Sequence, residues 1–357
     1  MGYLTEIGDA LRLFSAPTSI IDGIEQHSRR KMKVLYAGCA KHRDFIATKI
    51  FGSQIERISD TGRKPILFAG RGVANARADV FIATGPTSQL LTIRRESDLC
   101  IPWWIDCTVS ATEIINGPRS RGLQRDLGKV RKNDLRYEKA DSEEDVRFFY
   151  DRIYTPTVLQ SHGKEALPSS LASRLAQWAS GKAELLKIYQ NQDVIGGVMI
   201  DLREEIPSLR DIGVLDGDRS LKNMGVVTAA NFFGIEHLAR QGYDEVGMGL
   251  SRCFLDNGVL QYKLKWRPVF REPSRGGFLI RIPALNEASR AFLNSLDCIS
   301  MSSTGLVRAR FEAFEDGTYI GHEKPGNPSV VHGVARSRWY DISGYQPQFV
   351  PNDAMVN

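Results

Sequence analysis

The sequence has no long hydrophobic run. No stretch of roughly eighteen apolar residues is free of charged side chains, and this absence argues against a membrane-spanning helix. The first fourteen residues carry early acidic side chains and lack a basic start followed by a long apolar core, so we expect no secretory signal peptide. Position six is Glu6, which does not suit the sequence around a myristoylated glycine.

Cysteine and histidine are both scarce. No two cysteines have the spacing of a Cys-x-x-Cys motif, and the histidines form no His-x-x-x-His pair. Metal sites built from protein side chains usually show such close spacings, so we expect no metal cofactor. Scattered thiols in a chain without a signal peptide favour a reducing compartment, and we expect a cytoplasmic protein. The five cysteines are Cys39, Cys100, Cys107, Cys253 and Cys298.

Extremes of composition are absent as well. Hydrophobic residues make up 42% of the 357 residues and charged residues 25%, which excludes a collagen-like, disordered or disulfide-scaffold chain. The length predicts two domains of roughly 150 residues each, with some excess.

Positive charge is concentrated in one strip. Residues 119–136 hold seven arginines or lysines and two aspartates, a net charge of +5 that equals the excess of the whole chain. The rest of the chain is balanced, which excludes a general nucleic-acid coat. The strip is either a site for a phosphate-rich ligand or the solvated face of a helix.

Hydrophobic periodicity predicts a mixed α/β fold with a mixed central sheet flanked by helices. We expect short helices over residues 1–30, a first α/β lobe over 31–118, a second, larger domain over 119–320, and an extended tail over 321–357. Within the first lobe, residues 33–38 predict a strand and the following residues a helix that stops at Gly52.

The second half has clearer local signals. Residues 120–134 predict a basic helix, and residues 141–154 a helix that Pro156 ends. Two apolar runs around Asn191-Gln192-Asp193 predict a β-hairpin over 183–202. Residues 225–242 are the strongest helix, with Gly225 at its start and Gly242 at its end.

Two segments of this half contain candidate chemistry. A glycine at a helix entry leaves backbone N–H groups uncovered, and Lys222 just before Gly225 adds positive charge, which suits a diphosphate; the alternative is that Gly225 only packs closely. The segment from Tyr262 to Arg267 combines one phenol with three cations. It is either a solvated basic face or a place where a cation stabilises a developing oxyanion.

Residues 120–270 resemble the GNAT acyltransferase superfamily, and within it the FemAB-like branch. The resemblance rests on four motifs and on the basic run Arg121 to Lys132. The residues before 115 match only loosely, as a degenerate first GNAT-like lobe. The four motifs are Ile195-Gly196-Gly197-Val198-Met199-Ile200, Lys222-x-x-Gly225-x-Val227, the passage from His237 to Arg252, and Leu260-Gln261-Tyr262-Lys263-Leu264-Lys265-Trp266.

The resemblance implies an N-acyltransferase that moves an acyl group, in the first place acetyl, from acyl-CoA to a primary amine of an amino-sugar or amino-acid-like acceptor. Lys263 matches the position that contacts the donor carbonyl region in the family. Two residues depart from the family pattern: Val227 replaces a small residue, and Lys222 replaces an arginine or glutamine. The implied donor-binding set is Lys222, Asn223, Gly225, Val226, Val227 and Ser251.

The reaction needs a positioned thioester, a neutral amine and a stabilised oxyanion. Besides Lys263, Tyr262 is a candidate to protonate the leaving thiolate. Of the candidate general bases Asp211, Asp244, Glu245 and Asp256, we favour Asp211 or Asp256. Two other functions stay open: an aminoacyl-tRNA-dependent transferase whose basic strip holds tRNA phosphates, and a non-catalytic binding module on a degenerate GNAT fold.

Overall fold

The chain divides into two compact units. Unit 1 comprises Met1–Ile105, Arg252–Leu260 and Glu272–Asn357, and unit 2 comprises Asp106–Ser251 and Gln261–Arg271. A computed structural model describes residues 15–65, 77–86, 90, 94–95, 97–162, 170–271, 276–283, 285–302, 305–312, 314–315, 318–319, 334, 337–341 and 348–350.

These units differ from the expected domains. The first boundary lies at residue 105 rather than near 118, and residues 272–320 belong to unit 1 rather than to the second domain. The physical reason is strand pairing. Strand β13 (Gly276–Arg281) lies between β4 (Val80–Pro86) and β5 (Leu99–Pro102), so the late segment completes the first sheet.

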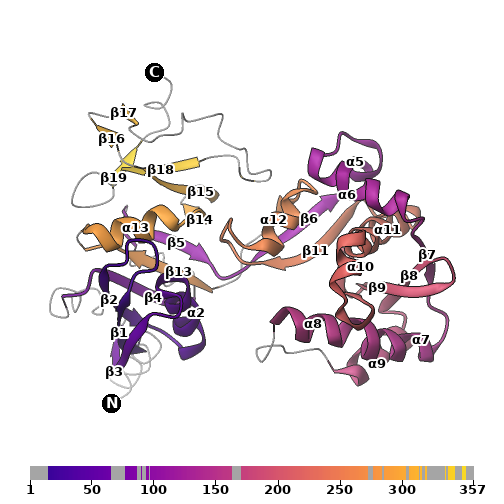
Figure 1. Ribbon diagram of the computed structural model, residues 1–357, viewed down its shortest axis with the longest axis horizontal. Helices are drawn as coiled ribbons and strands as arrows, with labels where there is room; N and C mark the ends of the chain where they lie inside the picture. The colour runs from indigo at the N-terminus through magenta and orange to yellow at the C-terminus, as the bar shows by residue number, and fades with distance from the viewer. Residues whose placement is uncertain are drawn as a thin grey trace, which may run out of the picture. The chain divides into compact units, whose positions relative to one another are not determined.

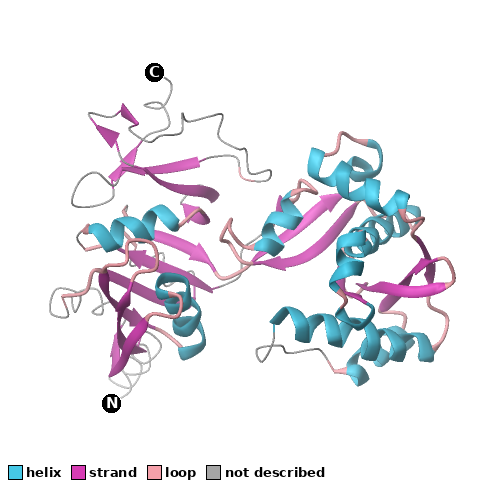
Figure 2. Ribbon diagram, viewed as in Figure 1, coloured by secondary structure: helices cyan, strands magenta, loops and turns pink. Residues whose placement is uncertain are grey.

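Unit 1 contains a six-stranded sheet in the order β3-β1-β2-β4-β13-β5 (Figures 1 and 2). Its other strands are β1 (Ser15–Ile24), β2 (Lys31–Ala37) and β3 (Ile55–Pro65). The helices expected over residues 1–30 are wrong for the described part, because β1 pairs with β2 on one side and β3 on the other. The β-branched residues of β1 favour a strand. Residues 1–14 lie outside the described residues.

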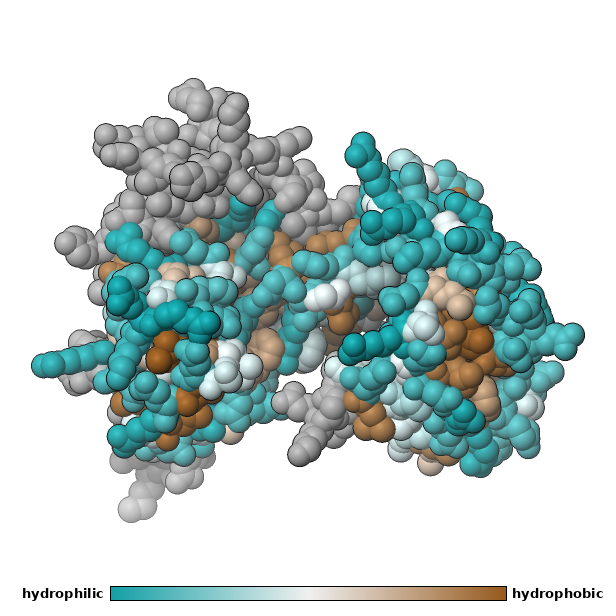
Figure 3. Space-filling view, viewed as in Figure 1, coloured by the Kyte–Doolittle hydropathy of each residue, from teal (hydrophilic) through white to brown (hydrophobic). Residues whose placement is uncertain are grey.

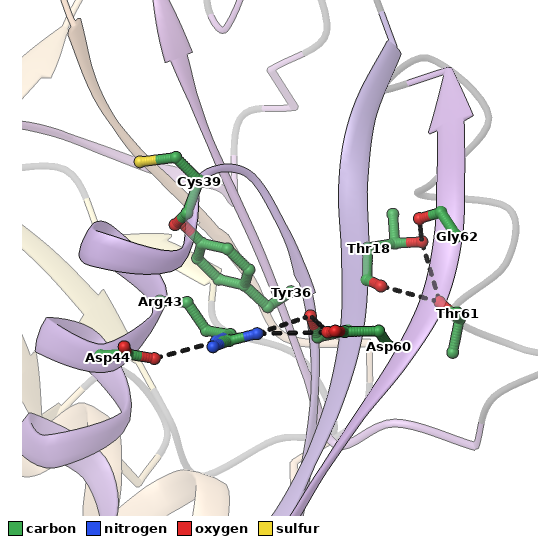
Figure 4. A network of polar contacts seen from close by, with 9 residues as sticks. Thr18, Tyr36, Cys39, Arg43, Asp44, Asp60, Thr61 and Gly62 are labelled. Carbon is green, nitrogen blue, oxygen red and sulfur yellow. Dashed lines mark hydrogen bonds and ion pairs between the residues drawn. The ribbon is translucent and has the colours of Figure 1, made fainter.

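The strand–helix signal at 33–52 is confirmed by β2 and by helix α2 (Ala40–Phe51). Gly38 joins them with a φ of +152°, and a Cβ there would lie 1.9 Å from the Thr84 hydroxyl, so only glycine fits. The Tyr36 hydroxyl donates to the Cys39 carbonyl over 2.9 Å, and Arg43 on α2 reaches Asp60 on β3 over 3.2 Å (Figure 4). These contacts fix α2 to the sheet.

Part of the expected tail belongs to unit 1. Strands β18 (Ser337–Asp341) and β19 (Gln348–Val350) join β14 (Cys298–Ser302) and β15 (Gly305–Glu312) in a four-stranded sheet. Strands β18 and β19, which fall within the expected extended tail, therefore belong to a folded sheet. Helix α13 precedes this sheet and a small β16–β17 hairpin follows β15; their bounds are Glu287–Ser295, Phe314–Glu315 and Thr318–Tyr319.

Unit 2 is built on a seven-stranded sheet in the order β12-β6-β11-β10-β9-β8-β7. Strands β7 to β10 are antiparallel neighbours, and β10 and β11 are parallel. The predicted hairpin is confirmed by β8 and β9, whose turn places Asn191 at a φ of +54°. The strands are β6 (Ile105–Ser110), β7 (Arg136–Lys139), β8 (Ala183–Gln190), β9 (Asp193–Asp201), β10 (Ser208–Val214), β11 (Glu245–Ser251) and β12 (Val269–Phe270).

The predicted helices of unit 2 are present with one correction. Pro156 does not end the helix that starts near residue 141, because α7 (Glu143–Phe148) continues through the π-helix η1 (Phe149–Tyr154) into α8 (Thr155–His162). Pro156 directly follows the π-helical turn, where the Thr155 N–H bonds to the Tyr150 carbonyl and the regular i to i−4 hydrogen bonding is already interrupted. The remaining helices are α5 (Ala111–Asn116), α6 (Arg121–Lys132), α9 (Leu171–Ala179), α10 (Arg219–Met224), α11 (Val226–Arg240) and α12 (Gly258–Leu264), of which residues 261–264 belong to unit 2.

Glycines set how closely these elements pack. A Cβ at Gly196 on β9 would lie 2.3 Å from a methyl of Val226 on α11, and one at Gly197 would lie 2.9 Å from the Phe149 ring. The two glycines of the hairpin motif therefore let α11 and η1 approach opposite faces of β9.

Much of the described surface in Figure 3 is hydrophilic, with apolar patches on each unit. Among the described residues, no helix combines the length and the apolar character that crossing a membrane requires.

A polar cluster ties three elements of unit 2 together and makes its stability depend on acid. Glu184 on β8 lies 2.6 Å from His237 Nε2 on α11 and 2.6 Å from Lys139 Nζ on β7. The His237 hydrogen bond is the main cause that lowers the pKa of Glu184 to about 2, with burial opposing it and Lys139 and Gln241 adding to it.

We expect Glu184→Gln to lower the free energy of unfolding at pH 7 by about 2 kcal/mol, measured by urea denaturation. The folded pKa lies below the unfolded pKa. The contribution of Glu184 is therefore present above about pH 4.5 and lost as the pH falls toward 2. The difference between the variant and the wild type should shrink over that range. The exposed Glu144→Gln serves as control and should cost less than about 0.5 kcal/mol. A loss at Glu184 that does not change with pH would contradict the linkage.

Candidate functional site

The candidate site lies in unit 2, where β10 and β11 separate. These two fully described strands pair in parallel at Ser208 and Gly247 only, near the start of β10. Beyond this point each strand leads to a helix at its carboxyl end: β10 to α10 and α11, and β11 to α12. In open α/β sheets, ligands bind beyond the carboxyl ends of strands that diverge.

Gly225 joins α10 to α11 in a left-handed conformation, with a φ of +105°. No side chain of the described residues caps the first turn of α11. The leading backbone N–H groups of this fifteen-residue helix therefore keep the partial positive charge of the helix dipole. The Val226 side chain is fully buried against Gly196, while Val227 is half-buried. This geometry can hold an anion.

The basic helix α6 meets this junction. A Cβ on Gly225 would lie 3.2 Å from the Cβ of Lys129, and the side chain of Asn133 donates to the Met224 carbonyl over 3.1 Å. Lys129 is exposed and forms no ion pair with any described residue. The sequence did not predict that α6 lies beside Gly225, because about ninety residues separate Asn133 from Met224.

Lys222 and Asn223 lie on α10. The Lys222 ammonium donates to Gln160 on α8 over 2.8 Å, and burial, with Arg219 adding, lowers its pKa. Asn223 is exposed. The Lys222 ammonium is therefore already bound to a neighbouring helix. Lys129 is the lysine whose side chain begins next to the backbone of Gly225.

Lys263 on α12 is buried and holds the end of β11. Its ammonium donates to the carbonyls of Gly249 and Leu250 over 2.7 and 2.9 Å. Gly249 has a φ of +74°, which breaks the regular strand and leaves these carbonyls to be satisfied from outside the ladder. Burial lowers the pKa of Lys263, against the attraction of Cys107 and Asp106.

Three side chains share this neighbourhood. Burial raises the pKa of Asp106 and of the Cys107 thiol on β6, and in both cases the Lys263 charge opposes it. Ser251, the last residue of β11, is buried with its hydroxyl toward Cys107. The sequence did not identify Asp106 and Cys107 as neighbours of Lys263, because no local pattern links them to a lysine more than 150 residues away.

Tyr262 on the same helix contacts α11 instead. Its hydroxyl lies 3.1 Å from the Asn231 side-chain nitrogen and 3.5 Å from the Val227 carbonyl. Burial raises its pKa above the usual range, so the phenol keeps its proton at neutral pH. The structure thus brings Gly225, Val226, Val227 and Tyr262 to one end of α11.

The four candidate bases are not gathered there. Asp211 on β10 forms a buried 2.5 Å ion pair with Arg174; burial raises its pKa and Arg174 opposes the rise. Asp256 belongs to unit 1, where it is exposed and pairs with Lys49 over 2.7 Å. Asp244 accepts from the Thr112 N–H at the start of α5, and Glu245 pairs with Arg271. Each carboxylate is thus already bound to a cation or a helix start.

Comparisons with known proteins were made at the level of sequence and of structure. No protein-family model matches the sequence, and the search of curated proteins found no match. The matching solved structures include FemX and a GCN5-related N-acetyltransferase, which are of the kinds that the sequence resembles.

Three of them illustrate the range. FemX is 9% identical, with 70% of this chain and 80% of FemX covered and a TM-score of 0.39. The C-terminal domain of a putative lysylphosphatidylglycerol synthetase from Agrobacterium fabrum is 12% identical, with coverage of 76% and 83% and a TM-score of 0.37. A GCN5-related N-acetyltransferase from Anabaena variabilis is 11% identical, with coverage of 80% and 63% and a TM-score of 0.29. Such low identities and TM-scores assign neither a family nor a substrate.

Proposed function

We propose that the chain is an N-acyltransferase that moves an acyl group from acyl-CoA to the primary amine of a small acceptor. One observation carries this proposal: the left-handed Gly225 junction leaves the first turn of α11 uncapped beyond the diverging ends of β10 and β11. A diphosphate suits this arrangement of N–H groups and helix dipole.

The donor's phosphates lie on the backbone N–H groups of Val226 and Val227 in this proposal. Burial of the Val226 side chain against Gly196 fixes the first turn, so little ordering is needed when the donor binds. Lys129 supplies a neighbouring positive charge, in place of the role expected for Lys222.

The amine then attacks the thioester carbon, a C–N bond forms, and the C–S bond breaks to release a thiolate. Holding the two reactants together supplies a large share of the catalysis. Tyr262 keeps its proton and can turn it from the Val227 carbonyl, a long contact of 3.5 Å, toward the thiolate, while Lys263 positions the end of β11. Because all four candidate carboxylates are already bound, the ammonium proton leaves through solvent water.

Thermal unfolding with added ligands tests the proposal. Coenzyme A at about a hundred times its Kd should stabilise the protein by about 2.7 kcal/mol, which raises the melting temperature by several degrees. Stabilisation by tRNA and not by coenzyme A would favour the aminoacyl-tRNA function. Stabilisation by neither would favour a binding module without catalysis.

The aminoacyl-tRNA donor has an observation in its favour, because exposed cations of α6 continue from Lys129 along the helix. Arg125 and Arg131 are exposed as well. A nucleic-acid donor would place several phosphates along this strip, whereas coenzyme A would reach only the part beside Gly225.

We expect the triple variant Arg125→Glu, Lys129→Glu and Arg131→Glu to separate the two donors. A coenzyme A enzyme should lose severalfold in donor affinity, through Lys129 alone, with a weak dependence on salt. A tRNA-dependent enzyme should lose activity about a hundredfold or more, and the wild type should weaken steeply with salt. Turnover measured over a salt series, with Lys129→Glu alone as control, distinguishes them. An unchanged triple variant would assign the strip to a solvated helix face.

A further inference from the structure

A pocket of about 370 Å³ opens between α6 and α11 in unit 2, beside the middle of α11 rather than its start. Its floor includes Phe232, Phe233 and Leu135, and three charged residues line it: Arg119, Arg131 and Asp134. This volume lies within the range of small-molecule sites in proteins.

The floor is aromatic and partly open. Phe232 and Phe233 are both half-buried, and their ring centroids lie 5.9 Å apart. The ring of Tyr137 supports Phe233 from the side, with centroids 5.2 Å apart. Two adjacent phenylalanines that keep part of their surface accessible in a concave site favour a large apolar group as ligand.

One arginine at the pocket is fixed in place. Arg119 donates from Nε to the Ile114 carbonyl over 2.8 Å and from Nη2 to the Ile115 carbonyl over 2.7 Å. Its guanidinium also lies 5.7 Å from the centre of the Phe232 ring. Arg119 therefore serves as a rigid positive wall of the pocket.

The other two charges are uncommitted. Arg131 and Asp134 are exposed, and neither side chain forms an ion pair or hydrogen bond with any residue in the described part of the chain. They lie three residues apart and line the same pocket, yet no ion pair joins them. Two exposed, unpaired opposite charges beside an apolar floor match a small ligand that carries both charges.

We propose that this pocket binds a free α-amino acid with a large apolar side chain. The ligand's carboxylate pairs with Arg131, its ammonium pairs with Asp134, and its side chain packs on Phe232 and Phe233. A planar guanidinium can hold a carboxylate through two parallel hydrogen bonds. The site is separate from the start of α11 and does not rest on the proposed acyl transfer.

Calorimetry on the full chain tests the proposal with three probes of similar shape. L-Phenylalanine carries both charges, 3-phenylpropionate lacks the ammonium, and 2-phenylethylamine lacks the carboxylate. L-Phenylalanine should bind at least about tenfold more tightly than either analogue, a difference of about 1.4 kcal/mol. No binding heat with L-phenylalanine up to about 10 mM, or equal affinity for all three probes, would overturn the proposal.

Two variants assign the contacts. Arg131→Gln should weaken L-phenylalanine binding at least about tenfold, whereas Arg121→Gln, an exposed arginine on the same helix that does not line the pocket, should change it less than twofold. Asp134→Asn should remove the preference for L-phenylalanine over 3-phenylpropionate and leave the binding of 3-phenylpropionate intact. Equal weakening by Arg131→Gln and Arg121→Gln would show general attraction to a basic helix, and it would overturn the site.

Discussion

Gly225→Asp should weaken coenzyme A binding at least about tenfold while the protein stays folded. The substitution puts a carboxylate at the start of α11, where a bound diphosphate would carry negative charge of its own. It also places a side chain in a left-handed conformation, 3.2 Å from the Cβ of Lys129. Isothermal calorimetry measures the affinity, and thermal unfolding reports the accompanying loss of stability, about 1–2 kcal/mol.

Gly225→Asn is the matched control for this result. Asparagine has nearly the shape of aspartate and tolerates the left-handed region, but it brings no charge. The two variants should be similarly stable, and the aspartate variant should bind coenzyme A several times more weakly than the asparagine variant. Equal affinities for both would mean that shape alone matters at Gly225, and an affinity unchanged from the wild type would remove the phosphate assignment.

Lys263→Met should lower the free energy of unfolding by about 2–4 kcal/mol in urea denaturation. The buried ammonium donates to the carbonyls of Gly249 and Leu250, and hydrogen bonds to a charged group contribute about 1.5–3 kcal/mol each. Methionine leaves both carbonyls without this donor. Relief from burying a charge, the effect that lowers the pKa of Lys263, offsets part of the loss.

Lys132→Met on the exposed side of α6 is the control and should cost less than about 0.5 kcal/mol. The stability measurement also decides what Lys263 does in turnover. If Lys263 only positions the end of β11, the Lys263→Met variant should lose stability and turnover together. If the variant unfolds like the wild type while turnover falls about a hundredfold or more, the ammonium acts on the reacting atoms instead.

The sequence by itself determined most of the local elements. The strand–helix unit at β2 and α2, the β8–β9 hairpin and helix α11 follow from short patterns: hydrophobic periodicity, a turn at Asn191, and glycine at helix boundaries. These patterns act within one or two turns of chain, where propensity and capping decide the backbone. The short helices expected over residues 1–30 are wrong for residues 15–24, where β-branched residues favour a strand and that strand pairs with a neighbour on each side.

Only the tertiary structure decided which of the candidate residues meet. Lys263 and Lys265 are two positions apart, yet Lys263 reaches the end of β11 while Lys265 pairs with Asp126 on α6, 139 residues away in the chain. The same holds for Lys129 beside Gly225 and for the α6–α11 pocket. Such contacts depend on how helices and strands pack, and the spacing of residues along the chain does not predict this packing. The sequence therefore located the turn of α11 where we propose that an anion binds, and the packing of α6 and of residues 261–264 within unit 2 supplied the residues around it.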